Sequence, residues 1–322
     1  MVDRVQGIHH ITAIGSDPQQ LVDFYTGVLG LRLVKKSVNQ DDVSAYHLFF
    51  GDRTGEPGMD LTFFTFPGVR RGSRGIGQVT LVSLAVPEDA MGFWQARFHE
   101  QGVRHEAIEE RFGRHRLRFY DPDDQQLELV AAPAPDLGTH EEQLWTTAAV
   151  GAQQAIRHFH SAHLSAASLG TVEPVLLQAL GYERIDQDGQ RSLYRLEDQV
   201  RAGELEVEEA PGGQPGLNAA GTVHHIAFAA HDEGHQLALR ERVLGMGLQP
   251  TQVIDRYYFK SVYFRIPAGI LFEIATMGPG FTADEDEATL GEKLALPPFL
   301  EDQREVIEAG LPPVHIPEVE QA

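Results

Sequence analysis

Two short stretches of the chain carry adjacent histidines in strand-like surroundings. The first is GIHHITAI, which contains His9 and His10, and the second is TVHHIAFA, which contains His224 and His225. Side chains of a β-strand alternate between its two faces, so we expect only one histidine of each pair to face a shared cavity. Two imidazoles from separate strands are suited to bind a transition metal, provided that a third ligand joins them.

A carboxylate near the C-terminal end of the same region can be that third ligand. In the segment SVYFRIPAGILFEIAT, the Pro-Ala-Gly turn predicts a hairpin whose register places Tyr263 opposite Glu273. Glu273 stands in an otherwise apolar strand, where an unpaired carboxylate would be costly. His10, His225 and Glu273 make two neutral imidazoles and one carboxylate, which is the ligand set of non-haem Fe(II) oxygenases and also suits Mn(II).

Four copies of one β-α-β-β-β unit are expected to position these residues. In the first unit, GSDPQQLVDFYTGVLGL predicts an amphipathic helix that Ser16 or Asp17 can cap, and three strand-like runs follow it. Related patterns recur three times along the chain. We assign modules to residues 1–68, 76–134, 156–212 and 219–278, a linker to 135–155, and a C-terminal arm to 279–322.

The repeats also indicate which modules share a cavity. A glycine closes the helix of each module: Gly30, Gly102, Gly181 and Gly245. We align the modules on these glycines and compare the residues that lie twenty positions before them. Those positions hold His10, Val82, Ser161 and His225, so only the first and fourth modules carry a histidine there. We therefore predict an α+β fold of two cupped mixed sheets, one from modules 1 and 4 and the other from modules 2 and 3.

Composition excludes several classes of function. The 322 residues include no cysteine, which rules out disulfides, thiolate nucleophiles and cysteine-ligated metals. The formal net charge of -21 argues against nucleic acid and against an anionic membrane surface as partners. No apolar run approaches the roughly 18 residues of a spanning helix, and the N-terminal stretch shows no signal-peptide pattern. We therefore expect a cytoplasmic protein, and we leave open whether it forms a homo-oligomer.

The motifs HHIT, HHIA and FEIAT, set in four such units, resemble the vicinal oxygen chelate superfamily. The longer pattern GIHHITAI, DFYTGVLGLRLVKK, VNQDD and YHLFFGD resembles ring-cleaving dioxygenases of the hydroquinone type, which open para-diols rather than catechols. This resemblance implies an enzyme of aromatic compound degradation, with a small aromatic substrate and O2 as its partners. It implies Fe(II) on His10, His225 and Glu273. The surrounding site residues that it implies are His9, Thr12, His224, Arg256 and Tyr263.

The resemblance leaves the acid/base role open among Tyr263, His224 and His9. It implies that Arg256 stabilises either the developing anion or the second hydroxyl of the substrate. One alternative is a glyoxalase-type isomerase or lyase. That activity usually requires a fourth ligand on the last strand of module 1, where DLTFFTF offers only Asp60 and threonines. Another alternative is a metal-free binding protein, which retention of all three ligands disfavours.

Histidines outside the first and fourth modules offer two further hypotheses. A catechol-cleaving arrangement would join His158 or His160 of module 3 to His225 and Glu273, but it would leave His10 without a role. A second metal site could also form from His158, His160, His163 and Glu128, although we favour relics of duplication for these residues. His47 in YHLFFGD is expected to be structural.

Overall fold

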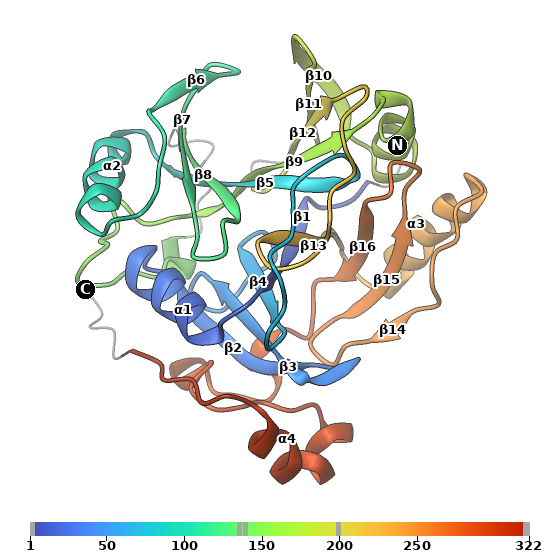
Figure 1. Cartoon of the computed structure of the whole chain (residues 1–322). Coiled ribbons are helices and arrows are strands. Elements are labelled where there is room, and N and C mark those ends of the chain that lie inside the picture. The colour runs from blue at the N-terminus through green and yellow to red at the C-terminus, as the bar shows by residue number, and fades with distance from the viewer. Residues whose placement is uncertain (1–3, 134–136, 138–140, 198–200, 318–322) are drawn as a thin grey trace.

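The computed structural model describes residues 4–133, 137, 141–197 and 201–317, and it contains two eight-stranded sheets (Figure 1). The strands of the first sheet are β1 (Ile8–Gly15), β2 (Arg32–Asn39), β3 (Asp42–Gly51), β4 (Asp60–Thr65), β13 (Thr222–Ala230), β14 (Ile254–Asp255), β15 (Lys260–Arg265) and β16 (Leu271–Thr276). Their order across the sheet is β14-β15-β16-β13-β1-β4-β3-β2. The pairing of β1 with β13 thus joins the first repeat to the fourth.

The second sheet joins the second repeat to the third through β5 and β9. Its strands are β5 (Gln78–Pro87), β6 (Glu109–Arg111), β7 (Arg114–Tyr120), β8 (Gln126–Ala132), β9 (His158–Ala166), β10 (Glu183–Asp188), β11 (Arg191–Arg195) and β12 (Glu204–Glu209). Their order is β10-β11-β12-β9-β5-β8-β7-β6. Both sheets mix parallel and antiparallel pairs, which confirms the predicted fold class of two cupped mixed sheets.

Helices cover the outer sides of the sheets. The first module begins with α1 (Pro18–Val22), which widens into a π-helix over Asp23–Val28, and the third contains a π-helix over Val175–Leu180. Asp17 caps α1 by accepting from the backbone N–H groups of residues 19 and 20. The remaining α-helices are α2 (Met91–Glu100), α3 (Glu233–Gly245) and α4 (Arg304–Gly310). No helix among the described residues is long and apolar enough to cross a membrane.

Short 3-10 helices connect these elements, and three of them lie in the C-terminal arm. They span Glu88–Ala90, Glu141–Gln143, Leu169–Thr171, Phe281–Ala283, Glu287–Thr289 and Pro298–Gln303. The arm packs beneath β2 and β3 in the lower part of Figure 1. The fully buried Lys35 of β2 anchors it by pairing with Asp284 at 2.7 Å and with Glu285.

Each His-His pair contains a β-bulge. Ile8 opposes Phe228 and His10 opposes Ala227, so His9 is an extra residue in β1; the same shift makes His224 an extra residue in β13. The strict alternation that the sequence pattern predicts is therefore broken at both pairs, because a bulge bends the strand and redirects its side chains. In the second sheet, the equivalent bulges fall at Thr80 and His160.

The bulges provide an alignment of the four modules that does not depend on helix ends. The residues after the bulges are His10, Leu81, Ser161 and His225. The glycine count is therefore wrong by one in module 2, where it selects Val82. In module 4, Gly245 is the last residue of α3, and the glycine with left-handed backbone is Gly247 at φ 78°. Histidines still occupy this position only in modules 1 and 4.

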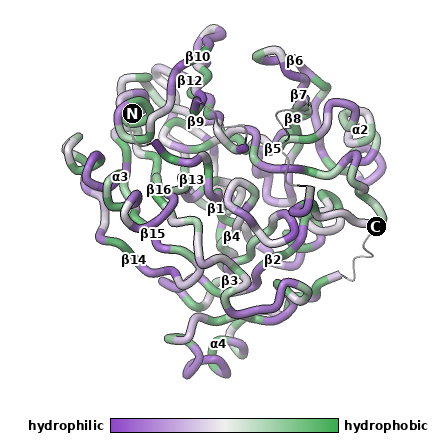
Figure 2. Tube along the Cα trace, turned by 180° about the vertical axis from the view of Figure 1, so that it is seen from behind, coloured by the Kyte–Doolittle hydropathy of each residue, from purple (hydrophilic) through white to green (hydrophobic). Residues whose placement is uncertain are grey.

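The short edge strands β6 and β10 were not evident from sequence. β6 has no apolar residue, and β10, with the sequence ERIDQD, is exposed along its whole length and largely hydrophilic in Figure 2. Several predicted module boundaries lie outside the described residues. They are the start at residue 1, the junction of module 2 with the linker at 134–135, and the end of the arm at 322.

Candidate metal centre

Three side chains converge at the centre of the first sheet. The Nε2 atom of His10 lies 3.2 Å from Nε2 of His225, and the Oε2 atom of Glu273 lies 3.3 Å from the first and 3.0 Å from the second. All three residues are buried. Metal bonds of about 2.1 Å at right angles place neighbouring ligand atoms about 3.0 Å apart, so this spacing fits three ligands on one face of a metal ion.

Glu273 is held as a carboxylate in this position. It lies in β16 directly opposite Tyr263 of β15, which confirms the predicted hairpin register. Burial opposes ionisation, but His10 and His225 outweigh it and hold the pKa of Glu273 well below its ordinary value. Ser261 donates to Oε1 at 2.5 Å, whereas Oε2 is buried without a hydrogen-bond partner and faces the two imidazoles. A metal ion would satisfy that oxygen.

His9 orients the imidazole of His10. Its Nε2 lies 3.1 Å from the backbone carbonyl of Thr276, which can only accept, so Nε2 carries the proton. Burial, with a smaller contribution from His10, lowers the pKa of His9 to about 3, and the ring is therefore neutral with a bare Nδ1. That Nδ1 lies 2.9 Å from Nδ1 of His10, which must donate. With Nδ1 donating to His9, Nε2 is the nitrogen of His10 that is left to bind a metal at the centre.

His224 stands in the same relation to His225. Their Nδ1 atoms are 2.8 Å apart, and burial together with His225 lowers the pKa of His224 to about 3. A neutral His224 can accept a hydrogen bond from Nδ1 of His225, which leaves Nε2 of His225 without a proton. Burial also lowers the pKa of His225 itself, although Glu273 opposes this. Both predicted ligand histidines therefore have a histidine partner beside them, made reachable by a bulge.

Two threonines extend the site away from His225. Thr12 of β1 lies 3.0 Å from Nε2 of His225, and Thr62 of β4 donates to Thr12 at 2.8 Å. Thr62 pairs with Thr12 across β1 and β4, just as Glu273 pairs with Ala227 across β13 and β16. Thr62 therefore occupies in module 1 the place that Glu273 occupies in module 4. The position for a fourth protein ligand holds a hydroxyl instead of a carboxylate or imidazole.

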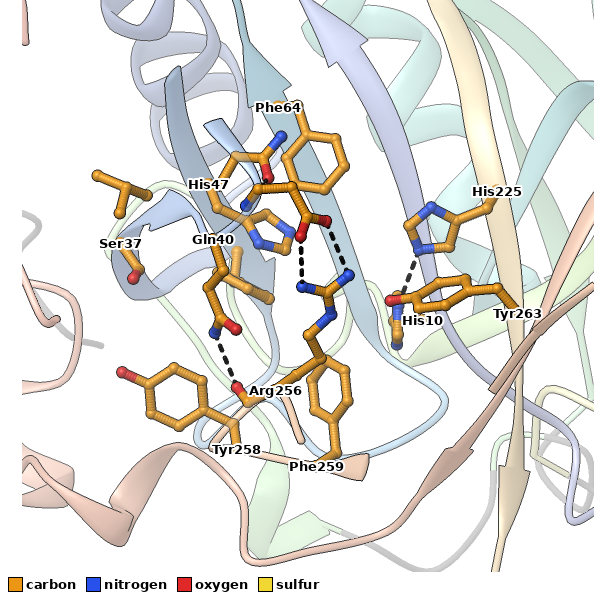
Figure 3. A pocket seen from close by; sticks show the side chains of 14 residues that line it. His10, Ser37, Gln40, His47, Phe64, His225, Arg256, Tyr258, Phe259 and Tyr263 are labelled. Atoms are coloured by element: carbon orange, nitrogen blue, oxygen red, sulfur yellow. Dashed lines mark hydrogen bonds and ion pairs between the residues drawn. The ribbon is translucent and has the colours of Figure 1, made fainter. Parts of the chain in front are cut away.

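A cavity opens beside His10 and His225, two of the three converging side chains (Figure 3). Tyr263 lines it, and burial together with Glu273 raises the pKa of its hydroxyl, so the phenol keeps its proton. Arg256 follows directly after β14 and stacks over the Tyr263 ring at 5.5 Å. Both of its terminal nitrogens also contact Asp41 in the turn between β2 and β3, at 2.8 and 3.1 Å. The aromatic walls of the cavity are Phe49, Phe64, Tyr258 and Phe259.

The structure thus brings His9, Thr12, His224, Arg256 and Tyr263 together around the three predicted ligands. Sequence reasoning missed Ser261, Thr62 and Asp41, which hold the ligands or Arg256 in place. Ser261 and Thr62 could have been found from strand register, since Ser261 shares a face with Tyr263 and Thr62 lies opposite Thr12. Asp41 sits in the VNQDD turn, and no pattern in the sequence connects it to Arg256.

The second sheet contains a related cluster without the character of a metal site. Glu128, His163 and Glu206 converge there, and the two glutamates occupy the positions equivalent to Glu273 and Thr62. However, Arg116 contacts Glu128 at 2.6 Å and Glu206 at 2.8 Å, and Arg111 contacts the same two carboxylates at 2.9 and 3.0 Å. Two buried guanidinium groups therefore supply the positive charge that a metal ion would otherwise supply.

The other histidines of module 3 do not join this cluster. Nδ1 of His158 contacts the carbonyl of Phe159 at 2.7 Å, and His160 lies 3.7 Å from Glu204. Neither lies in the sheet that holds Glu273, because β9 pairs with β5 and β12. The rival arrangement that joins module 3 to module 4 in one sheet is therefore contradicted by the strand order.

Comparison with known proteins identifies the class. Residues 7–129 match the Glyoxalase/Bleomycin resistance protein/Dioxygenase superfamily. The chain is 42% identical over 320 residues to the "Putative ring-cleaving dioxygenase MhqO" of Bacillus subtilis, covering 99% of this chain and 100% of that protein. It is 35% identical over 310 residues to the chlorohydroquinone/hydroquinone 1,2-dioxygenase of Sphingobium indicum, covering 93% and 94%.

A solved structure agrees with these relatives. The crystal structure of a "putative dioxygenase" from Bacillus subtilis superposes with a TM-score of 0.92 at 41% identity, covering 98% of this chain and 99% of that one. The fold and the two His-His strands place the protein in the vicinal oxygen chelate class. Within that class, the chain belongs to the family of ring-cleaving dioxygenases.

Proposed function

We propose that the protein is an Fe(II)-dependent dioxygenase that opens the aromatic ring of a hydroquinone-type substrate with O2. The observation that carries the proposal is the buried set of His10, His225 and Glu273, whose ligand atoms face one another at 3.0–3.3 Å. A facial set of two histidines and one carboxylate leaves adjacent positions open for other ligands. The hydroquinone 1,2-dioxygenase named above supports the choice of substrate class.

Fe(II) bound to these three ligands would accept a substrate oxygen and dioxygen at its open positions and would lower the pKa of the coordinated hydroxyl. His9 and His224 keep the two ligand imidazoles in the tautomer that binds a metal, and Ser261 fixes the carboxylate. These three residues therefore act on the metal through its ligands. They hold the ligand geometry constant while substrate and product exchange.

The cavity wall orients the substrate ring and supplies protons. Phe64 and Phe259 offer aromatic surfaces on which a planar ring can pack. The Tyr263 hydroxyl is protonated and lies on the face that holds Glu273, so it is suited to donate to an oxygen of the reacting substrate. Arg256, held by Asp41 and stacked on Tyr263, places a fixed positive charge where negative charge develops as the ring opens.

An oxygen-uptake assay tests the reaction class. The protein is reconstituted anaerobically with Fe(II) and then exposed to air-saturated buffer with hydroquinone, with catechol, or with a methylglyoxal–thiol adduct. The proposal predicts oxygen consumption with hydroquinone. Consumption with catechol alone would change the reaction to vicinal-diol cleavage, and isomerisation of the thiol adduct without oxygen use would support a glyoxalase-type activity. The choice of Fe(II) over Mn(II) and the cytoplasmic location stay predictions.

A further inference from the structure

His47 of β3 is a third imidazole in the cavity, beside His10 and His225, and takes no part in the ligand set. It lines the same space as His10, His225, Arg256 and Tyr263 (Figure 3). Its ring packs between two phenylalanines, with ring centroids 3.8 Å from Phe49 and 4.4 Å from Phe64. A polar ring fixed so closely between aromatic neighbours has a defined orientation, which a merely space-filling residue would not need.

The hydrogen bond between two threonines determines which nitrogen of His47 carries no proton. Thr62 of β4 donates to Thr12 of β1 at 2.8 Å. The single hydroxyl proton of Thr62 is thereby used, so Thr62 must accept from Nε2 of His47 at 2.9 Å. His47 therefore carries a proton on Nε2. Burial holds the pKa of His47 well below its ordinary value, so the ring is neutral and Nδ1 is an unprotonated acceptor.

The position of that acceptor suits a group on the far side of the substrate ring. Phe64 packs against His47 and also lies 6.3 Å from the ring of His225, and all three side chains line the same cavity. Arg256 offers donors only, and both of its terminal nitrogens are already engaged by Asp41. A hydroxyl that is para to the metal-bound oxygen needs an acceptor at the opposite wall of the cavity.

We propose that His47 is a specificity-determining residue whose Nδ1 accepts a hydrogen bond from the substrate hydroxyl remote from the metal. This inference rests on the proposed function, since it places the first hydroxyl at the metal. It makes the site selective for para-diols: a ring that lacks the distal donor would leave Nδ1 of His47 unsatisfied. It also replaces the structural role expected for His47 from sequence.

Two amide substitutions separate the two nitrogens of His47. In His47→Gln the amide reaches the place of Nε2, so it can still donate to Thr62 but offers nothing at Nδ1. In His47→Asn the amide lies near the place of Nδ1 and loses the contact with Thr62. His47→Phe removes both nitrogens and matches the neighbouring Phe49 and Phe64 in shape. His115→Gln, at an exposed position of β7 in the other sheet, is the matched control.

The readout is the equilibrium binding of hydroquinone and of 4-fluorophenol, which has fluorine in place of the distal hydroxyl. Each is titrated anaerobically by calorimetry into Fe(II)-loaded protein. We expect the wild type and His115→Gln to prefer hydroquinone by about 10-fold, the equivalent of one hydrogen bond. The preference should fall to about 1 in His47→Gln and His47→Phe, with 4-fluorophenol affinity unchanged, and should largely persist in His47→Asn.

The outcomes distinguish this inference from the function on which it rests. An undiminished preference in both His47→Gln and His47→Phe would overturn the role of His47 and leave the dioxygenase proposal intact. Wild-type protein that binds neither ligand would overturn both. If His47→Gln is unstable, His47→Phe gives the same decision, and thermal unfolding of each variant shows which samples are folded.

Discussion

The Nδ1 atoms of His9 and His10 lie 2.9 Å apart, and the opposite nitrogen of His9 lies 3.1 Å from the carbonyl oxygen of Thr276. The Thr276 carbonyl can only accept a hydrogen bond, and His10 must keep Nε2 free for the proposed metal. These two conditions leave one arrangement of protons along the hydrogen-bonded series from Thr276 through His9 to His10. His9 therefore sets the tautomer of His10. The contact exists only because His9 is the extra residue of a β-bulge in β1.

Replacing His9 should weaken metal binding without removing a ligand. In His9→Phe, Nδ1 of His10 loses its acceptor, and we expect affinity for Fe(II) to fall by about 10–100-fold, as is usual for such supporting residues. His9→Asn keeps an oxygen that can accept from His10 and should lose less. Competition with a chelator under anaerobic conditions measures both. Wild-type affinity in His9→Phe would show that His9 does not orient its neighbour.

Glu273 and Glu128 form a matched pair, since they occupy equivalent positions in the two sheets. We expect Glu273→Gln to lose bound iron, because the carboxylate ligand is gone. Glu128→Gln should keep one iron per chain, but it should lower the free energy of unfolding by about 3–5 kcal/mol, since Arg111 and Arg116 lose a buried partner. Metal analysis and urea unfolding of the metal-free proteins test the pair. Loss of iron in Glu128→Gln would place a metal in the second sheet.

The stability of the metal-free protein should fall as the pH falls from 6.5 toward 3. The pKa values of buried His9 and His224 are lowered from 6.5 to about 3, so in this range the unfolded chain binds more protons than the folded one. Glu273, whose pKa is held below 4.5 by His10 and His225 despite burial, acts in the same direction at the acid end. Urea unfolding at a series of pH values measures the slope.

The corresponding variants identify the groups responsible for this slope. His9→Asn and His224→Asn should each reduce proton uptake on unfolding by up to one proton per chain at about pH 5. A slope that is the same in the wild type and in both variants would contradict the assignment of neutral histidines to these positions.

The pairing of Arg256 with Asp41 should matter for catalysis. Arg256→Lys keeps the charge but cannot contact both carboxylate oxygens and stack on Tyr263 at once, so we expect kcat/KM for hydroquinone to fall by about 10-fold or more. Asp41→Asn keeps the turn but weakens the hold on Arg256, and it should show a smaller loss. Unchanged kcat/KM in Arg256→Lys would mean that the guanidinium geometry is not used.

Much of the site follows from local patterns in the sequence. The register of Tyr263 against Glu273 could be counted from one tight turn, because cross-strand pairing propagates from a hairpin. The positions of His10 and His225 followed from the repeats, although Gly245 is not the glycine with left-handed backbone. Two copies of one strand come together across a long stretch of chain because each module must cover a sheet face that it cannot bury alone.

The remaining features depend on contacts between elements, which periodicity does not encode. A bulge is a shift of one residue between two strands, so the contacts of His9 and His224 were invisible until their partners were known. Arg111 and Arg116 supply positive charge in the second sheet from the β6–β7 hairpin. The first strand of that hairpin is three residues long, too short to be recognised from sequence. Asp41 meets Arg256 across a sequence separation of 215 residues.

The most direct test of the central claim is the amount of oxygen consumed per hydroquinone by protein that contains one Fe(II) per chain. The iron-loaded protein should consume one O2 per hydroquinone and abolish the aromatic absorbance of the substrate, and the same protein should take up no oxygen after the iron is removed. Full activity in the iron-free protein, or full activity in His225→Ala, would contradict a dioxygenase centred on His10, His225 and Glu273.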